Sequence, residues 1–187
     1  MPTNKSSGTV ARLGLPCLFA ALIAAGAFIA IPLPGNPVPV VVQNLFVVLS
    51  GLLLGPLAGG VSVALFLCLG IVGFPVFSGG HGGLAVLAGP TGGYLVGYLV
   101  AAVTAGFLAR RRKPVATIIA SILAFGLILA FGCTGLHLLR NVGWAKALAV
   151  GALPFLVGDG VKCILAILLT LKLGPFVDSI RRRTVNA

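Results

Sequence analysis

Six long runs of apolar residues, separated by short breaks, make up most of the chain. They span residues 13–31, 39–55, 57–74, 84–109, 115–139 and 148–173. A helix needs about 17–25 mostly apolar residues to cross the hydrocarbon core of a bilayer, and each run reaches that length. The pattern therefore predicts an all-α integral membrane protein, in which residues 13–175 form one domain of six transmembrane helices.

The breaks between the runs are rich in residues that end helices. Three prolines between residues 32 and 37 separate the first run from the second. Gly55-Pro56 predicts a tight turn between the second run and the third. Glycines concentrate between residues 73 and 83, which predicts a flexible loop before the fourth run.

The composition supports lipid as the solvent of this chain. Only 8% of the 187 residues are charged and 59% are hydrophobic, whereas a soluble domain carries about 25% charged residues. A water-soluble fold with so few charges would expose large apolar patches and aggregate. The four cysteines lie inside apolar runs and form no C-x-x-C pair, so they indicate small packing residues.

The net charge of +11 comes largely from three basic clusters, Lys5 with Arg12, Arg110–Lys113 and Arg181–Arg183. With six crossings these clusters share one face of the membrane, and the positive-inside rule makes that face cytoplasmic. Residues 1–12 and 176–187 are therefore predicted to be cytoplasmic tails. No stretch outside the apolar runs is long enough to form a nucleic-acid-binding domain, so we expect no nucleic-acid partner.

The first run also has features of a signal peptide, because basic residues precede it and small residues follow near Ala25. Its length of about 19 residues exceeds the ~7–15 of a signal-peptide core, which favours a retained first helix. Cleavage of this run would leave the topology of the other five unchanged.

One of the two acidic residues, Asp159, lies near the outer end of the sixth run, and Lys162 follows on the same helical face. A charge at mid-bilayer costs roughly 2.5–3.5 kcal/mol on insertion scales, so such residues face a protein interior or a watery cavity. The two residues either form an ion pair that only neutralises both charges or belong to a polar binding pocket. The flanking Gly158 and Gly160 favour the pocket, because they permit close approach of a ligand.

Two further side chains are candidates for the same pocket. Asn44 opens the second run, where its amide needs a partner, either on another helix or in the cavity that holds Asp159. Tyr94 lies near the outer end of the fourth run, where its ring could stack on a bound molecule and its hydroxyl could form a hydrogen bond.

The glycine-rich loop adds candidates of another kind. Ser78, Gly79 and Gly80 lie in this loop, and the backbone of such a segment can contact a ligand directly. His81 in the same loop could act as a ligand group or a pH switch, but a single loop histidine is a weaker candidate than its neighbours.

Alanines recur at a spacing of four on the first run, as Ala20-x-x-x-Ala24 and Ala21-x-x-x-Ala25. Small residues at this spacing let membrane helices approach closely. The glycines at 51, 55 and 59 are expected to pack within the chain, whereas Ala20 and Ala24 are candidates for docking a partner membrane protein.

Several chemistries lack their sequence motifs. The chain has no G-x-x-x-x-G-K-[ST] phosphate loop and no H-E-x-x-H motif. Its single acid within the apolar runs, Asp159, argues against a membrane transferase that uses paired carboxylates. We therefore expect a protein that is not an enzyme and holds neither a metal nor a cofactor.

The motifs together resemble those of the BioY family, the biotin-specific substrate-binding (S) components of energy-coupling factor (ECF) transporters. The resemblance covers about residues 20–173. It rests on Gln43-Asn44 with Ser50-Gly-Leu-Leu-Leu-Gly-Pro56, on Gly79-Gly-x-Gly-Gly-Leu with Gly89-Pro-Thr-Gly-Gly-Tyr94, and on Pro154-Phe-x-x-Gly-Asp159-x-x-Lys162.

The resemblance implies a six-helix component of the bacterial cytoplasmic (inner) membrane that binds biotin near the outer face and tilts to deliver it inward. It implies a transmembrane coupling (T) protein, docked on the alanine-rich face of the first helix, and two ATPase subunits that hydrolyse ATP. Biotin is then the transported ligand, and no cofactor is implied.

Biotin has groups that suit the candidate residues. Asp159 can accept hydrogen bonds from the two ureido N–H groups, and an amide such as that of Asn44 can complement the ring. The valerate carboxylate suits Lys162, because a buried anion needs a partner of this kind.

Two other functions stay open at this point. The chain could be the S component for another vitamin, such as riboflavin or thiamine, which competition by unlabelled vitamins would distinguish. It could also be a secondary transporter with Asp159 as the proton-coupling carboxylate, and a protonophore would then abolish transport.

Overall fold

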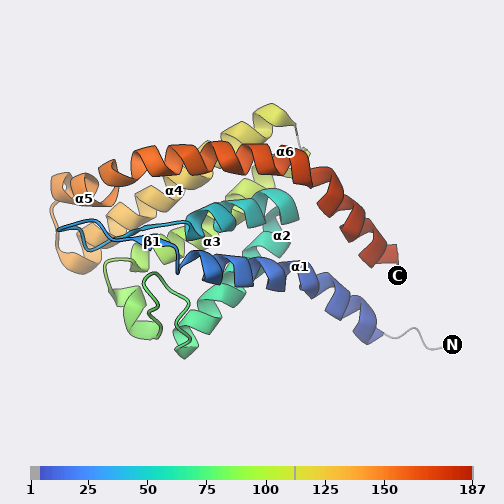
Figure 1. Cartoon of the computed structure of the whole chain (residues 1–187), viewed down its shortest axis with the longest axis horizontal. Coiled ribbons are helices and arrows are strands. Elements are labelled where there is room, and N and C mark those ends of the chain that lie inside the picture. The colour runs from blue at the N-terminus through green and yellow to red at the C-terminus, as the bar shows by residue number, and fades with distance from the viewer. Residues whose placement is uncertain (1–4, 112, 187) are drawn as a thin grey trace.

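The computed structural model describes residues 5–111 and 113–186. Its α-helices are α1 Lys5–Gly26, α2 Gln43–Val72, α3 Gly92–Leu108, α4 Pro114–Arg140, α5 Trp144–Gly151 and α6 Leu156–Asn186. Short 3-10 helices η1 Leu84–Ala88, η2 Ala109–Arg111 and η3 Leu153–Phe155, and a hairpin of β1 Ala30–Ile31 and β2 Val40–Val41, connect them. Figure 1 shows both termini at one end of the bundle and α5 with the hairpin at the other.

Helix α2 contains both the second and the third predicted crossing. Its course breaks at Gly55, whose φ of 82° and ψ of 178° are not helical, and Pro56 follows. Glycine adopts this backbone conformation without a steric penalty. The tight turn predicted at Gly55-Pro56 is confirmed. The second helical half packs back against the first, because a Cβ atom on Gly59 would lie 2.7 Å from the Gly51 Cα atom. Gly106 of α3 lies against this turn, because a Cβ atom there would come within 2.7 Å of the Pro56 Cα atom.

The first helix begins and ends earlier than predicted. It runs from Lys5 to Gly26 instead of over residues 13–31, and the last residues of that run form strand β1. Ala30 pairs with Val41 and Ile31 with Val40 in antiparallel register. The proline-rich break between the first and the second run is therefore the connection between the two strands of this hairpin.

Prolines shift the starts of two other helices. The fourth predicted run begins with η1, and α3 starts only at Gly92, after Pro90. The sixth run is interrupted after α5, where Pro154 lies in η3, and α6 starts at Leu156. Proline lacks the backbone N–H and its ring clashes with the preceding turn, so it kinks or breaks a helix and is tolerated best in the first turn.

The described parts of both predicted tails are helical, because α1 begins at Lys5 and α6 continues to Asn186. Some basic residues on which the topology prediction depends are not described in full. Arg112 lies outside the described residues, and the structure describes only the backbone of Lys5, Arg12, Arg111, Arg182 and Arg183.

Small residues bring the central helices into close contact. Helix α2 packs against α1 and α3, and α3 packs against α4. A Cβ atom on Gly51 would lie 2.9 Å from the carbonyl carbon of Ala102, and one on Gly135 would lie 2.6 Å from the Cα atom of Gly93. Such close packing of backbones is typical of helix contacts in membranes, and it confirms that Gly51 packs within the chain.

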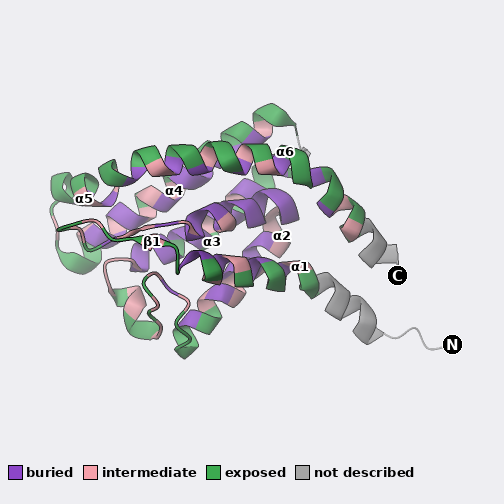
Figure 2. Cartoon of the chain, viewed as in Figure 1, coloured by how far each residue is buried: buried purple, intermediate pink, exposed green. Residues whose placement is uncertain are grey.

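Exposed residues lie on the outward faces of the helices (Figure 2), and many of them have large apolar side chains. Phe107 on α3, Ile122 on α4 and Ile164 on α6 are each about 60% exposed. Three helical segments are long and apolar enough to cross a membrane, Gln43–Val72, Pro114–Arg140 and Trp144–Arg181, and the shorter apolar helices are Leu13–Gly26 and Gly92–Leu108. A surface of this kind is suited to contact with lipid chains rather than with water.

Candidate functional site

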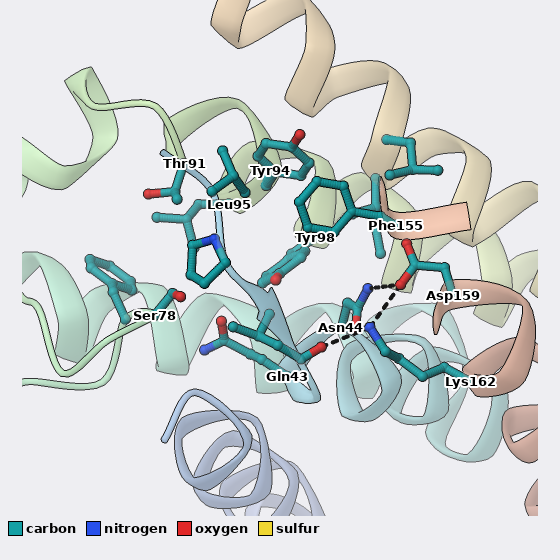
Figure 3. A pocket seen from close by; sticks show the side chains of 16 residues that line it. Gln43, Asn44, Ser78, Thr91, Tyr94, Leu95, Tyr98, Phe155, Asp159 and Lys162 are labelled. Atoms are coloured by element: carbon teal, nitrogen blue, oxygen red, sulfur yellow. Dashed lines mark hydrogen bonds and ion pairs between the residues drawn. The ribbon is translucent and has the colours of Figure 1, made fainter. Parts of the chain in front are cut away.

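Three polar side chains from two distant parts of the chain meet inside the bundle (Figure 3). The Asn44 amide nitrogen, at the start of α2, donates to Asp159 Oδ1 over 2.9 Å. Lys162 Nζ donates to the same oxygen over 2.7 Å and to Asn44 Oδ1 over 3.0 Å. The structure thus places the Asn44 amide at Asp159 and Lys162, which is one of the two alternatives that the sequence left open for it.

This polar cluster is well shielded from the surroundings of the protein. The exposed fractions are 6% for Asn44, 4% for Asp159 and 8% for Lys162. Removing two charges from water costs several kcal/mol for each ion, and their attraction offsets that cost only when hydrogen bonds satisfy both groups. Such a pair is weak support for stability alone, so a binding role explains its place in the bundle better.

The cluster forms one end of a partly open pocket. Small-molecule sites usually combine mostly apolar walls with a few convergent polar groups. The pocket has this character. Its walls are Val38, Pro39, Val41, Gln43, Asn44, Phe77, Ser78, Thr91, Tyr94, Leu95, Tyr98, Ile128, Leu129, Phe155, Asp159 and Lys162.

The glycine-rich loop contributes Ser78 to this pocket, whereas Gly79 and Gly80 are not among the lining residues. Both glycines have a φ of 75°, and the turn closes through a hydrogen bond from the Gly80 N–H to the Phe77 carbonyl. This backbone conformation is unfavourable for other residues. The glycines therefore shape the turn that places Ser78, while His81 in the same turn is exposed and does not line the pocket.

Tyr94 lines the pocket with its ring and uses its hydroxyl within the protein. The hydroxyl donates to the carbonyl of Gly151 over 2.6 Å. Gly151 ends α5, so this bond ties the start of α3 to the α5–η3 corner. Phe155 from that corner packs near the Tyr94 ring, with 6.3 Å between the ring centroids. Tyr94 thus offers a ligand its aromatic surface.

Replacing Tyr94 with phenylalanine is expected to destabilise the protein by about 1–3 kcal/mol, because the buried Gly151 carbonyl loses its donor. Thermal unfolding of the detergent-solubilised protein measures this change. Tyr98→Phe is the matched control, since no hydrogen bond of the Tyr98 hydroxyl occurs among the described residues. Equal midpoints for the two variants would contradict the role of the bond.

Several pocket residues were not among the sequence-based candidates. Tyr98 lies four residues after Tyr94 on the same helical face, a spacing that could have revealed it. Gln43 is next to Asn44 and Phe155 is four residues before Asp159, and both belong to the sequence motifs of the family. Gln43 donates to the Val76 carbonyl over 3.2 Å and so connects α2 to the glycine-rich loop. Val38 and Pro39 had no comparable signal, because only the hairpin brings them to the pocket.

Ala20 and Ala24 of α1, the candidates for docking a partner protein, face the interior of the bundle rather than its outside. Ala20 is 4% exposed and belongs to the core, and Ala24 is half-buried. Their side chains pack inside the chain, so Ala20 is not accessible to a partner in this structure. The neighbouring Ala21 and Ala25 are exposed, which places the alternative alanine repeat on the outer face of α1.

Comparisons with known proteins agree on one family. The model of the BioY family matches residues 2–179. The biotin transporter BioY of Thermotoga maritima is 41% identical over 157 residues, which cover 83% of this chain and 91% of the relative. The biotin transporter BioY of Rhizobium etli is 39% identical over 168 residues, which cover 84% of this chain and 89% of the relative.

A solved structure extends this agreement to the fold. The S component for biotin from an ECF-type ABC transporter matches with a TM-score of 0.82 and 30% sequence identity, over 92% of this chain and 94% of that one. This protein is accordingly an all-helical, multi-pass integral membrane protein with the fold of an ECF S component. On the family match and on these relatives, the chain belongs to the BioY family.

Proposed function

We propose that this protein is the biotin-binding S component of an ECF-type vitamin importer. It would capture biotin at the outer face and deliver it inward together with ATP-hydrolysing partners. The observation that carries the proposal is the buried cluster of Asn44, Asp159 and Lys162 at one end of an apolar pocket. Relatives with 41% and 39% identity are named biotin transporters, and the matched solved structure is an S component for biotin.

The pocket offers complementary chemistry to the fused rings of biotin. Asp159 would accept hydrogen bonds from the ureido N–H groups, and Asn44 would complete the contacts to the ureido group. Leu95, Tyr98 and Phe155 provide an apolar and aromatic wall for the rings. Biotin is the cargo in this proposal, which assigns the chain no cofactor.

The seven residues predicted from the sequence to bind the ligand take part in two ways. Asn44, Ser78, Tyr94, Asp159 and Lys162 line the pocket. For Gly79 and Gly80 we propose an indirect role, because their positive φ angles shape the turn that carries Ser78.

The proposed topology has six crossings, with residues 13–175 as the membrane domain and the kinked α2 as two of the crossings. The first half of α2 is only about 18 Å long at 1.5 Å per residue, because this helix begins inside the bundle, at the pocket. Both termini lie at the end of the bundle opposite to the hairpin (Figure 1), and Arg110, Lys113 and Arg181 are exposed. The positive-inside rule supports a cytoplasmic location for this end.

The proposed partners are a transmembrane coupling protein and two ATPase subunits. Their support is the printed description of the matched structure as part of an ECF-type ABC transporter, together with the lack of a phosphate-loop motif in this sequence. For docking of the coupling protein we propose the exposed Ala21 and Ala25 in place of Ala20 and Ala24, because small exposed residues permit close approach of another helix. The chain itself is a transport component of a non-enzymatic family.

Equilibrium binding of radiolabelled biotin to the purified, detergent-solubilised protein tests the ligand. We expect saturable binding that unlabelled biotin displaces and that riboflavin and thiamine do not. A folded protein that binds no biotin would refute the proposal.

Biotin uptake into proteoliposomes tests the mechanism of transport. We expect that proteoliposomes with the ATPase module take up biotin even when a protonophore dissipates the proton gradient. If proteoliposomes without the module take up biotin, and a protonophore abolishes this uptake, the protein is a secondary transporter.

A further inference from the structure

An exposed apolar stripe runs along α3 and ends in a basic residue. Its members lie three or four residues apart, a spacing that places them on one helical face, and they are Val96, Leu99, Val103 and Phe107. Arg110 continues this spacing in η2 and is exposed too. In a bilayer the α3 stripe, residues 96–107 of this face, would meet acyl chains, and Arg110 would lie at its end.

The aromatic ring of Phe107 holds Arg110 at the side of the bundle. The Cζ atom of Arg110 lies 5.6 Å from the centroid of this ring, which is within the distance of a cation–π contact. Because Phe107 is exposed on the outward surface, the guanidinium group lies beside the wall that faces lipid. Basic side chains at the ends of membrane helices keep their charge at the level of the lipid headgroups, so Arg110 is placed to meet a headgroup.

Helix α4 begins with a similar arrangement. Lys113 is the N-cap residue of this helix and is exposed, and Val115, Ile118 and Ile122 are exposed along the helix that follows. Helices α3 and α4 pack against each other, and only two residues separate Lys113 from Arg110 in the sequence. Two apolar faces on neighbouring helices therefore end in two cations on one short connection.

These cations have no acidic residue near them in the sequence. The two acids of the chain are Asp159 and Asp178, both on α6, so residues 1–158 contain no carboxylate side chain. Among the described residues, neither Arg110 nor Lys113 forms an ion pair. The two residues between them are also arginines. The α3–α4 connection thus carries four consecutive basic residues, which attract an anion from outside the chain.

We propose that the α3–α4 connection binds the headgroup of an anionic phospholipid, with Arg110 and Lys113 as its partners on the protein and the α3 stripe as the wall for an acyl chain. The inference goes beyond the transport function and does not depend on the identity of the transported ligand.

Charge and position both support this occupant. The start of α4 lies at the end of the bundle that carries both termini (Figure 1), which we propose to be cytoplasmic. The cytoplasmic leaflet has a negative surface potential from anionic lipids, and it attracts basic segments next to membrane helices. The contact of Arg110 with an exposed ring on the lipid-facing wall favours a lipid over an acidic partner protein.

Binding of lipid to the purified, detergent-solubilised protein tests the proposal. Phosphatidylglycerol and phosphatidylcholine with identical acyl chains are added separately, and native mass spectrometry measures the fraction of protein that carries each lipid. We expect phosphatidylglycerol to bind about tenfold more tightly. In the double variant Arg110→Gln with Lys113→Gln this preference should be largely lost, because each basic residue at a membrane surface contributes about fivefold in affinity.

The matched control is Arg140→Gln with Lys146→Gln, which removes two exposed charges around the α4–α5 connection and should keep the preference. Without added lipid, both double variants should unfold at a temperature close to that of wild type, because the exchanged side chains are exposed. Glycerol 1-phosphate, which has the anionic headgroup but no acyl chains, should not displace phosphatidylglycerol at equal concentration.

Three results would overturn the proposal. An unchanged preference in the Arg110 and Lys113 double variant would remove the site, and if that variant also failed to assemble with the coupling protein, the connection would serve that protein instead. An equal loss in the control variant would show that only net charge acts. Displacement by glycerol 1-phosphate would indicate a site for soluble anions, in which the α3 stripe has no part.

Discussion

Asp159→Asn is expected to lower the affinity for biotin by roughly 10- to 100-fold. In wild type, Oδ1 accepts from Asn44 and Lys162, which leaves Oδ2 for the ligand. An asparagine has one oxygen, and Lys162 will hold it, so the carboxamide N–H₂ group would face the ureido N–H groups of biotin. The loss of a hydrogen bond to a charged group costs about 1.5–3 kcal/mol, and each 1.4 kcal/mol is tenfold in affinity.

The same substitution will also lower stability. Lys162 is buried, and removing one partner of a buried ion pair costs up to about 3–5 kcal/mol, because the remaining charge is uncompensated. Binding is therefore measured by isothermal titration at a temperature well below the unfolding midpoint of the variant. Asp178→Asn is the matched control, because Asp178 is the other acid of the chain and does not line the pocket. An unchanged biotin affinity in Asp159→Asn would remove Asp159 from the site.

Gly51→Ala is expected to destabilise the bundle by about 1–3 kcal/mol or more, although alanine is the better helix former. A Cβ atom on Gly51 would clash with the Ala102 carbonyl and lie 3.0 Å from the Ala102 Cα atom. These are backbone atoms, so no side-chain rotation relieves the contact, and α2 and α3 must separate. Because both helices line the pocket, biotin affinity should fall together with the unfolding temperature.

Gly126→Ala provides a control of opposite sign. Gly126 lies within α4, is exposed, and has no heavy atom within 4 Å of a Cβ atom built on it. Alanine in a helix interior is favoured over glycine by roughly 0.5–1 kcal/mol, so this variant should unfold at the same or a higher temperature. Thermal unfolding of both variants in the same detergent measures the difference. A Gly51→Ala variant as stable as Gly126→Ala would show that α2 and α3 tolerate separation.

The sequence alone determined the solvent, the class of fold and the family. Apolar runs long enough to cross a bilayer and the very low charge content leave lipid as the environment. Asp159 and Lys162 were identifiable as functional candidates because their spacing places them on one helical face and because charges are rare and costly in membranes. The motifs around them led to the BioY family, which the comparisons confirm.

The ends of some helices depend on contacts between distant parts of the chain, which the local pattern of apolar residues does not show. The apolar run 13–31 continues past the end of α1, but its last residues pair with β2, so the run is partly strand. The direction of the alanines on α1 was equally undetermined. Ala20 with Ala24 and Ala21 with Ala25 have the same spacing, and both lipid and core are apolar, so hydrophobicity cannot distinguish the inner repeat from the outer one. Only the packing of α1 on the bundle places Ala20 inside.

The use of each polar atom in the pocket was decided by tertiary structure. Asn44 and Asp159 are 115 residues apart in the sequence, and Lys162 reaches the Val41 carbonyl across 121 residues. Sequence reasoning could place these residues in one cavity but could not count the donors of Lys162 that remain free. Nor could it show that Ser78 Oγ lacks a partner. Residue types define which hydrogen bonds are possible, whereas the fold determines which of them are already made within the protein and which are left for a ligand.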